Sequence, residues 1–135
     1  MIRASYYEND TLYHWYEYIY DDRNNMIAAI VYEDDTSVWR NECEYDSNNN
    51  RVKTISYNED NIISHWYEYE YDSNGNNTKV TRHNEDGSIY FWREYEYDSQ
   101  GNGLNETQYN SDGSVELHID EAVPFYYLHE GYIVE

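Results

Sequence analysis

The chain has 135 residues, a net charge of −20 from 28 acidic and 8 basic residues, and an aromatic content of 19%. This charge excludes nucleic acid and anionic membrane surfaces as partners, because they would repel the chain, and it favours a basic protein. High charge and few aliphatic residues are typical of disorder, but 19 tyrosines and 4 tryptophans supply the apolar area for a folded domain over residues 1–135. The alternative interpretation is that the acidity only keeps an aromatic sheet soluble and monomeric.

A cytoplasmic location is expected from what the chain lacks. The first residues, MIRASYYEND, contain no apolar stretch of the kind found in secretion signals, and no run reaches transmembrane length. Cys43 is the only cysteine, so no internal disulfide can form. It stands where other repeats carry Tyr or Glu, which predicts a packed and unreactive thiol.

A phrase that alternates aromatic and acidic residues occurs four times. It reads HWYEYIYDD from His14, VWRNECEYDS from Val38, HWYEYEYDSNGN from His65 and FWREYEYDSQGN from Phe91. The closing aspartates are Asp21, Asp46, Asp72 and Asp98, and an aromatic residue follows each by eleven positions, at Tyr32, Tyr57, His83 and Tyr109. A period of about 25–26 residues indicates a repeat array. Such an array has a broad, repetitive surface, which suits binding better than catalysis.

The period divides the chain into an N-terminal half-repeat, four repeats and a C-terminal cap. The half-repeat spans residues 1–13, and the repeats span 14–37, 38–64, 65–90 and 91–118. The cap spans residues 119–135, is more apolar, lacks the tryptophan phrase and contains the only proline, Pro124. Repeat arrays need atypical ends to close their exposed faces and edges.

Each repeat is predicted to be a pair of antiparallel strands. In the third repeat, residues 66–71 alternate with a period of two, which is typical of a strand with two distinct faces. Residues 72–76 form a turn in which Gly75 can take a positive φ, residues 78–83 form the return strand, and residues 85–88 form a second turn with an Asp-Gly step. The fold class is therefore all-β: an antiparallel meander of about nine or ten strands in an elongated, twisted or curled sheet.

The second repeat departs from the regular spacing. Six residues separate Trp15, Trp66 and Trp92 from their closing aspartates, but seven separate Trp39 from Asp46. One extra residue reverses the alternation of a strand unless a β-bulge absorbs it. We therefore predict a bulge between Trp39 and Tyr45 that restores the register.

The last two repeats carry the resemblance to a known family. YEYDSNGN and YEYDSQGN, followed by NEDGS and NSDGS, resemble the YD repeats of the RHS/YD family, in which a Tyr-Asp-x-x-Gly turn is paired with a later Asp-Gly turn. The resemblance covers residues 5–115 and is weaker in the first two repeats, where Arg23-Asn24 and Asn48-Asn49 replace the glycine step. Long members resemble β-sheet shells around toxin domains, which four copies cannot close. Short acidic proteins of this kind also resemble immunity proteins, which neutralise bacterial toxins.

The candidate binding residues lie at equivalent repeat positions. Glutamates at these positions are predicted to line up in rows on one face, with too few bases, such as Lys53, Arg82 and Arg93, to neutralise them. Glu42 and Glu44 join these rows if the predicted bulge restores the register. The alternative is a solvated outer face with tryptophans packed between strands. The predicted partner-binding residues are Glu17, Glu68, Glu70, Glu94, Glu96, Trp15, Trp66, Trp92, Asp72 and Asp98.

No residue pattern predicts catalysis, a metal or a cofactor. The Asp and Asn clusters in the turns lack the spacing of an EF-hand and are interpreted as turns that cap their own backbone. The five histidines, at 14, 65, 83, 118 and 129, have no zinc-binding spacing, and there is no nucleophile elbow or phosphate loop.

Two hypotheses of function follow, from different classes. The first is a non-enzymatic immunity protein that covers the active site of a basic toxin, such as a nuclease, with an acidic, aromatic surface. The second is a carbohydrate-binding or cell-wall-binding module, in which sugars stack on exposed rings. A third interpretation, a fragment of a longer RHS-type shell, is disfavoured by the distinct ends at Met1 and Pro124.

Overall fold

The computed structural model describes residues 2–8, 11–33 and 36–119, and these residues form ten β-strands. The predicted C-terminal cap lies outside the described residues except for Ile119. The strands are β1 (Ile2–Glu8), β2 (Thr11–Tyr20), β3 (Met26–Glu33), β4 (Thr36–Tyr45), β5 (Arg51–Tyr57), β6 (Ile63–Tyr71), β7 (Asn77–Asn84), β8 (Ile89–Tyr97), β9 (Gly103–Asn110) and β10 (Val115–Ile119).

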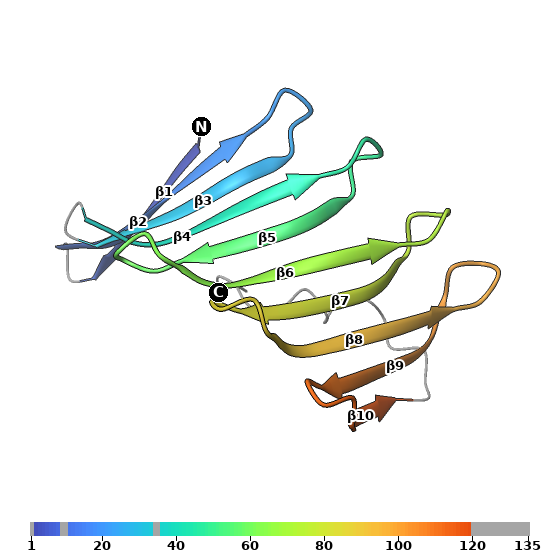
Figure 1. The fold of residues 1–135 in the computed structure, drawn as a ribbon. Coiled ribbons are helices and arrows are strands. Elements are labelled where there is room, and N and C mark those ends of the chain that lie inside the picture. Colours follow the sequence, from blue (N-terminus) through green and yellow to red (C-terminus); the bar gives the residue numbers. More distant parts are fainter. Residues whose placement is uncertain (1, 9–10, 34–35, 120–135) are drawn as a thin grey trace.

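The strands form a single antiparallel sheet in which the order of the strands is the order of the chain. Figure 1 shows them as one twisted layer, with hairpin turns along both ends of the strands. The all-β meander predicted from the repeat is therefore confirmed, and the sheet is open, because β1 and β10 pair with no further described strand. The described residues include no helix that is long and apolar enough to cross a bilayer.

The cross-strand pairing assigns each strand residue to one of two faces, because paired residues in an antiparallel sheet point to the same side. We call one side the glutamate face. It consists of Trp15, Glu17, Tyr32, Arg40, Glu42, Glu44, Lys53, Tyr57, Trp66, Glu68, Glu70, Lys79, His83, Trp92, Glu94, Glu96 and Tyr109. The other side is the tyrosine face, which consists of Tyr16, Tyr18, Trp39, Cys43, Tyr67, Tyr69, Arg82, Phe91, Arg93, Tyr95 and Glu106.

The turn that closes each tryptophan phrase is held by its own aspartate. In the third repeat, Asp72 Oδ1 accepts hydrogen bonds from the N–H groups of Asn74 and Asn76, both at 2.9 Å, and Oδ2 accepts one from Asn76 Nδ2 at 2.9 Å. Gly75 has a φ of 86°, as its sequence position predicts. Asn24 and Asn49 take the same left-handed conformation in the first two repeats, because Asn tolerates it better than other residues with a side chain.

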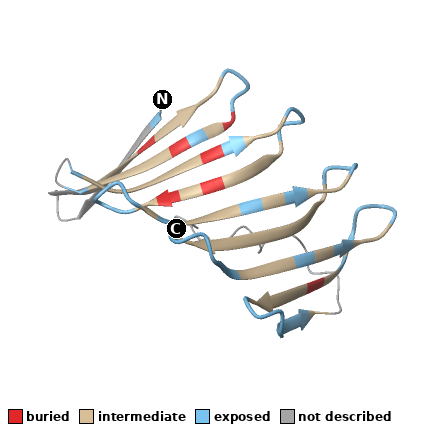
Figure 2. Ribbon diagram, in the orientation of Figure 1, coloured by how far each residue is buried: buried red, intermediate tan, exposed pale blue. Residues whose placement is uncertain are grey.

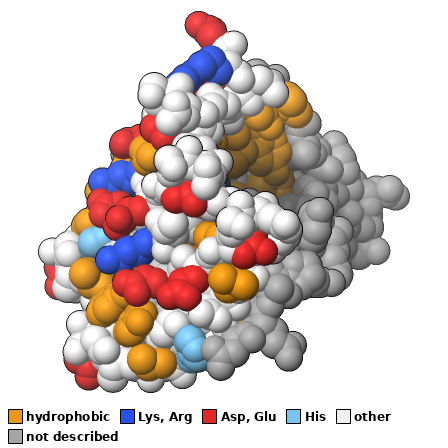
Figure 3. Space-filling model, turned by 90° about the vertical axis from the view of Figure 1, so that its right-hand side faces the viewer, with side chains coloured by type: hydrophobic (Ala, Val, Ile, Leu, Met, Phe, Trp, Pro, Cys, Tyr) orange, Lys and Arg blue, Asp and Glu red, His pale blue; other side chains and the backbone are white. Residues whose placement is uncertain are grey.

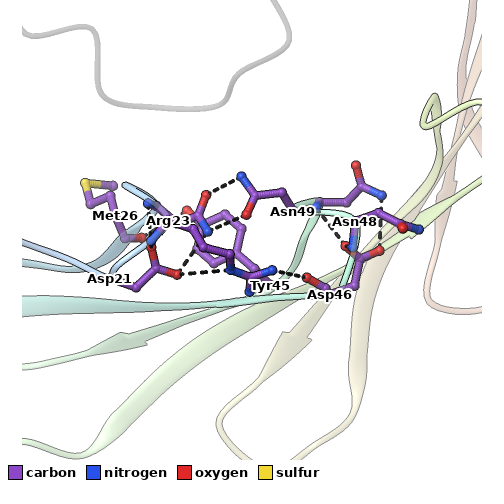
Figure 4. A network of polar contacts seen from close by, with 9 residues as sticks. Asp21, Arg23, Met26, Tyr45, Asp46, Asn48 and Asn49 are labelled. Carbon is purple, nitrogen blue, oxygen red and sulfur yellow. Dashed lines mark hydrogen bonds and ion pairs between the residues drawn. The ribbon is translucent and has the colours of Figure 1, made fainter.

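Neighbouring turns are also linked to one another. The side-chain amides of Asn25 and Asn49 exchange two hydrogen bonds of 2.7 Å, which joins the first turn to the second (Figure 4). Tyrosine hydroxyls join the hairpins further, since Tyr45 donates to the Met26 carbonyl oxygen at 2.9 Å and Tyr97 to that of Asn77 at 2.7 Å. The array is therefore held together by polar contacts at the ends of the strands as well as by the sheet.

The extra residue in the second repeat has a different outcome from the one predicted. The pairing does shift between Glu44 and Tyr45, but the same shift occurs at the corresponding place in other repeats, between Glu70 and Tyr71 for example. No additional bulge absorbs the insertion, so Trp39 pairs with Val31 and lies on the tyrosine face. Arg40 takes the position that tryptophan has elsewhere, and Glu42 and Glu44 still join the glutamate face.

Burial is spread thinly over this single layer. Among the described residues, the buried hydrophobic side chains are Ala28 and Cys43, and no large side chain is fully buried (Figure 2). The burial of Cys43 agrees with the predicted packed thiol. Most strand residues are half-buried by their cross-strand neighbours, and such side-chain pairs are the main source of stability in a sheet.

Candidate protein-binding face

The glutamate face is built from a repeated stack of side chains on adjacent strands. Trp15 lies parallel to Tyr32 with ring centroids 3.9 Å apart, and Trp66 lies parallel to His83 at 4.9 Å. Trp92 stacks on Tyr109 in the same way at 5.0 Å. In the second repeat the Arg40 guanidinium replaces the indole and lies 4.1 Å from the ring centroid of Tyr57.

In three of the four stacks a glutamate lies at the polar atom of the second ring. The hydroxyl of Tyr32 donates to Glu17 Oε2 at 3.2 Å, and that of Tyr57 donates to Glu42 Oε2 at 3.0 Å. In the third repeat, His83 Nε2 lies 3.3 Å from Glu68 Oε2. These contacts fix the orientation of the carboxylates, so that part of the acidic surface is preorganised.

The rings of Trp66 and Trp92 have a neighbouring group on each flat side. His83 of β7 covers one side of the Trp66 ring, and Lys53 Nζ of β5 lies 5.5 Å from its centroid. For Trp92, Tyr109 of β9 and Lys79 of β7 occupy the equivalent positions, with the ammonium at 5.9 Å. Because the covering groups come from strands on opposite sides, only the edges of these indoles face outward. The predicted packing of tryptophan between strands is therefore present on the same face as the glutamates.

The glutamates do not form uninterrupted rows, which corrects the arrangement expected from sequence. Glu68 and Glu94 occupy equivalent repeat positions, but they do not lie on the same line across the sheet. Glu94 pairs with Lys79, and Lys79 pairs on its other side with Glu70. Equivalent positions are thus displaced by two residues from one repeat to the next, because each repeat contains bulges. Lys79 on the intervening strand therefore lies between the carboxylates of Glu70 and Glu94, so that each carboxylate has a positive charge as its cross-strand neighbour.

Lys53 shows the same alternation in the preceding repeat. It pairs with Glu44 on one side and Glu68 on the other, and its Nζ lies 3.7 Å from Glu68 Oε1. Arg82 and Arg93, which the sequence suggested as neutralising bases, lie instead on the tyrosine face. The charge on the glutamate face is therefore a mixture in which carboxylates predominate.

The predicted binding residues differ in accessibility. Glu68, Glu70, Glu94 and Glu96 are exposed, whereas Glu17 is only 7% exposed and its carboxylate is occupied by Tyr32. Trp15, Trp66 and Trp92 are half-buried in their stacks. The structure therefore brings four exposed glutamates together on one face, with Glu17 placed beneath the surface.

Asp72 and Asp98 lie in the turns at the ends of the strands. Hydrogen bonds from the side chain and backbone of Asn76 lower the pKa of Asp72, and the equivalent bonds from Asn102 lower the pKa of Asp98. Both carboxyl groups are thereby kept charged while they hold their own turns. No group of three or more His, Cys, Asp or Glu side chains in the described part of the chain is arranged to hold a metal ion.

Some residues of the glutamate face were not predicted from the sequence as part of the site, among them Lys79, Arg40 and His83. Lys79 was overlooked because its cross-strand neighbours depend on the two-residue displacement, which no single repeat reveals. Arg40 was overlooked because Trp39 was aligned with the other tryptophans. The signal for His83 was present, since it replaces the repeat tyrosine, but it was interpreted as structural.

The tyrosine face differs in chemistry and in shape. The rings of Tyr67 and Tyr69 have centroids 6.4 Å apart, and the Arg51 guanidinium lies 5.0 Å from the Tyr69 centroid. Glu106 on this face is 5% exposed and lies 3.7 Å from Arg93. Figure 3 shows charged side chains of both signs mixed along one side of the molecule and hydrophobic side chains lining a hollow on another.

These features define a β-hairpin repeat protein with an open sheet and one face that carries exposed carboxylates. No family model matches the chain, and no curated protein matches it. Its structure is similar to a chain in the crystal structure of TcdB2-TccC3-TEV, with a TM-score of 0.56 and 13% sequence identity over 78% of this chain and 5% of that one. A second match is the pore of the Tc holotoxin of Photorhabdus luminescens with a mutated TccC3, with a TM-score of 0.32, 9% identity, and coverage of 87% of this chain and 9% of that one.

The first match concerns the fold. This chain spans a small fraction of the length of that toxin-complex chain, and at 13% identity the likeness shows that both contain a β-sheet meander of this type. It agrees with the meander of hairpins that the RHS/YD resemblance implied.

Proposed function

We propose that this protein is a non-enzymatic immunity protein that binds a basic bacterial toxin, such as a nuclease, through its glutamate face. The observation that carries the proposal is the exposure of five carboxylates on one face, those of Glu44, Glu68, Glu70, Glu94 and Glu96. The net charge of −20 and the fold shared with part of a toxin-complex chain support it. A toxin that binds nucleic acid needs a cationic surface, and this face offers carboxylates in place of phosphates.

The geometry suits electrostatic docking more than the binding of sugars. Carboxylates two residues apart on a strand lie about 7 Å from each other, so an arginine or lysine can reach each pair. Long-range attraction would speed the encounter with a basic partner. A sugar would need a bare ring to stack on, but His83 and Lys53 cover both sides of Trp66. The protein-binding hypothesis is therefore the better supported of the two.

The test begins with capture of a partner by the full-length protein. The bait is expressed in cells together with the neighbouring open reading frames, and the bound proteins are identified by mass spectrometry at low and high salt. We expect a basic protein that is retained at low salt and weakened at high salt. Capture of no basic protein at either salt concentration contradicts the proposal.

A matched pair of variants then locates the binding face. The first variant replaces four of the exposed glutamates of the face, E68Q/E70Q/E94Q/E96Q. The control, D22N/E59Q/D60N/E85Q, removes the same number of charges from exposed turn residues. Exposed ion pairs contribute about 0.2–1 kcal/mol each, so the face variant should bind about 4-fold to about 700-fold more weakly than the native protein. Equal weakening by both variants would mean that net charge matters and the face does not.

A further inference from the structure

Position 83 is where the third repeat departs from the chemistry of the others. The aromatic residue that follows the closing aspartate by eleven positions is tyrosine in the other three repeats, and histidine here. Tyr32 and Tyr57 each donate a hydroxyl proton to a glutamate. His83 keeps the contact with Glu68, at 3.3 Å. The third repeat has therefore replaced a hydroxyl that stays protonated at neutral pH with an imidazole, whose charge changes between about pH 5 and 8 in proteins.

The two ring nitrogens of His83 each lie near an oxygen atom. Nε2 faces Glu68 Oε2, and Nδ1 lies 3.4 Å from the carbonyl oxygen of Gly87. Nε2 is buried and makes no hydrogen bond in this structure, so its contact with Glu68 is one of proximity. A neutral imidazole can donate its single proton to the Gly87 carbonyl oxygen, whereas an imidazolium also carries a proton on Nε2, next to the Glu68 carboxylate. The ring is also stacked on Trp66, and a cation beside an indole ring gains a further attraction.

Besides Glu68, the charged groups near His83 come from strand β5 and from the turn that follows His83. Lys53 of β5 lies 3.7 Å from Glu68 Oε1, so it opposes a second positive charge while it shares the same carboxylate. Glu85 and Asp86 belong to the turn that follows His83, and Asp86 is engaged by Ser88 at 2.6 Å. On β8, the residue paired with His83 is the uncharged Ile89. Glu68 is thus the carboxylate in direct contact with the imidazole.

We propose that protonation of His83 regulates the glutamate face by withdrawing Glu68 from external cations. When the imidazole is neutral, Lys53 is the one cation beside Glu68, and the carboxylate keeps capacity for a partner. When the imidazole is charged, Lys53 and His83 hold both oxygens of Glu68 between them. A basic partner then meets a face with one effective carboxylate fewer and one positive charge more. The consequence for binding rests on the proposed function, whereas the proton-dependent contact between His83 and Glu68 does not.

The contact is tested on the free, full-length protein. Tryptophan fluorescence is recorded between about pH 8 and pH 5, because an imidazolium stacked on an indole quenches its emission. The native protein should lose emission as the pH falls. The control variant H65Q should lose emission in the same way, because His65 lies on the tyrosine face. H83Y, which restores the repeat residue, should lose much less, and the Cε1–H resonance of His83 should shift less in E68Q than in the native protein. Equal quenching in H83Y and the native protein overturns the proposal.

The effect on binding is tested with a decalysine peptide as the cationic probe. The native protein should bind the peptide several-fold more weakly at about pH 5.5 than at about pH 7.5, because a charged His83 then competes with the peptide for Glu68. H83Y should lose this dependence. If the fluorescence result holds but H83Y and the native protein show the same pH dependence of binding, the regulation of the face by His83 is refuted. If the fluorescence result fails while E68Q/E70Q/E94Q/E96Q still weakens the peptide, the proposed function stands without its regulation.

Discussion

Replacing Gly101 by alanine tests the backbone conformation on which the turns depend. Gly101 has a φ of +84°, and a methyl group added there would lie 3.5 Å from Asn76 Oδ1. A left-handed conformation costs a residue with a side chain about 1–2 kcal/mol. Alanine also restricts the unfolded chain, which offsets about 0.4–1 kcal/mol of that cost. We expect G101A to lower the free energy of unfolding by about 1 kcal/mol from these two terms.

Gly103 supplies the matched control in the same hairpin. A methyl group at Gly103 would meet no atom within 4 Å, and its backbone is not left-handed. G103A should therefore restrict the unfolded chain without straining the folded one, and should raise the free energy of unfolding by about 0.4–1 kcal/mol. Urea unfolding followed by tryptophan fluorescence gives both values, provided that the slopes of the transitions agree. If G101A is as stable as G103A, the conformation assigned to this turn is wrong.

Two further predictions concern the tyrosines and the asparagines at the strand ends. Burial raises the pKa of Tyr45, Tyr71 and Tyr97 above the ordinary value of 10.0, so the unfolded chain loses these protons at a lower pH than the folded protein does. The free energy of unfolding should therefore be unaffected below about pH 10 and should fall as the pH rises further. The fall should be smaller in Y97F, which lacks one of these hydroxyl groups. Urea midpoints at pH values below and above 10 would show this, and an unchanged midpoint would contradict it. N49G should cost about 1 kcal/mol more than N24G, because both asparagines are left-handed but Asn49 also exchanges hydrogen bonds with Asn25. Equal unfolding free energies for the two variants would mean that the amide pair contributes nothing.

The elements of this fold could be predicted because their signals are local. Alternation with a period of two located the strands, and the Asp-Gly and Asn-rich steps located the turns. The left-handed conformation was predicted for Gly75, and the structure adds it for Asn24 and Asn49. The face occupied by Trp39 was predicted wrongly, because an insertion can be absorbed by a bulge or can displace the phrase, and the sequence contains no signal that distinguishes the two.

The candidate site could be predicted only in part, because it depends on how repeats are displaced against each other. The face shared by Trp66 and Glu68 followed from alternation within one strand. The neighbours of Glu94 depend on bulges in two successive strands, so Lys79 could not be placed opposite it from spacing. The burial of Glu17 likewise depends on contacts made across strands.

The order of the strands in the sheet has a consequence for how such a chain can change its length. Each strand pairs only with the strands before and after it in the chain, so removing or adding a whole hairpin requires no other segment to be rerouted. An added hairpin would bring its own stacked ring, its own carboxylates and, where the pattern holds, its own lysine. The number of cations that the glutamate face can accommodate would then grow with the number of copies, while the chemistry of each copy stayed the same. Duplication of a single hairpin would thus adjust the strength of binding in steps, without a change to any existing contact in the interior of the sheet.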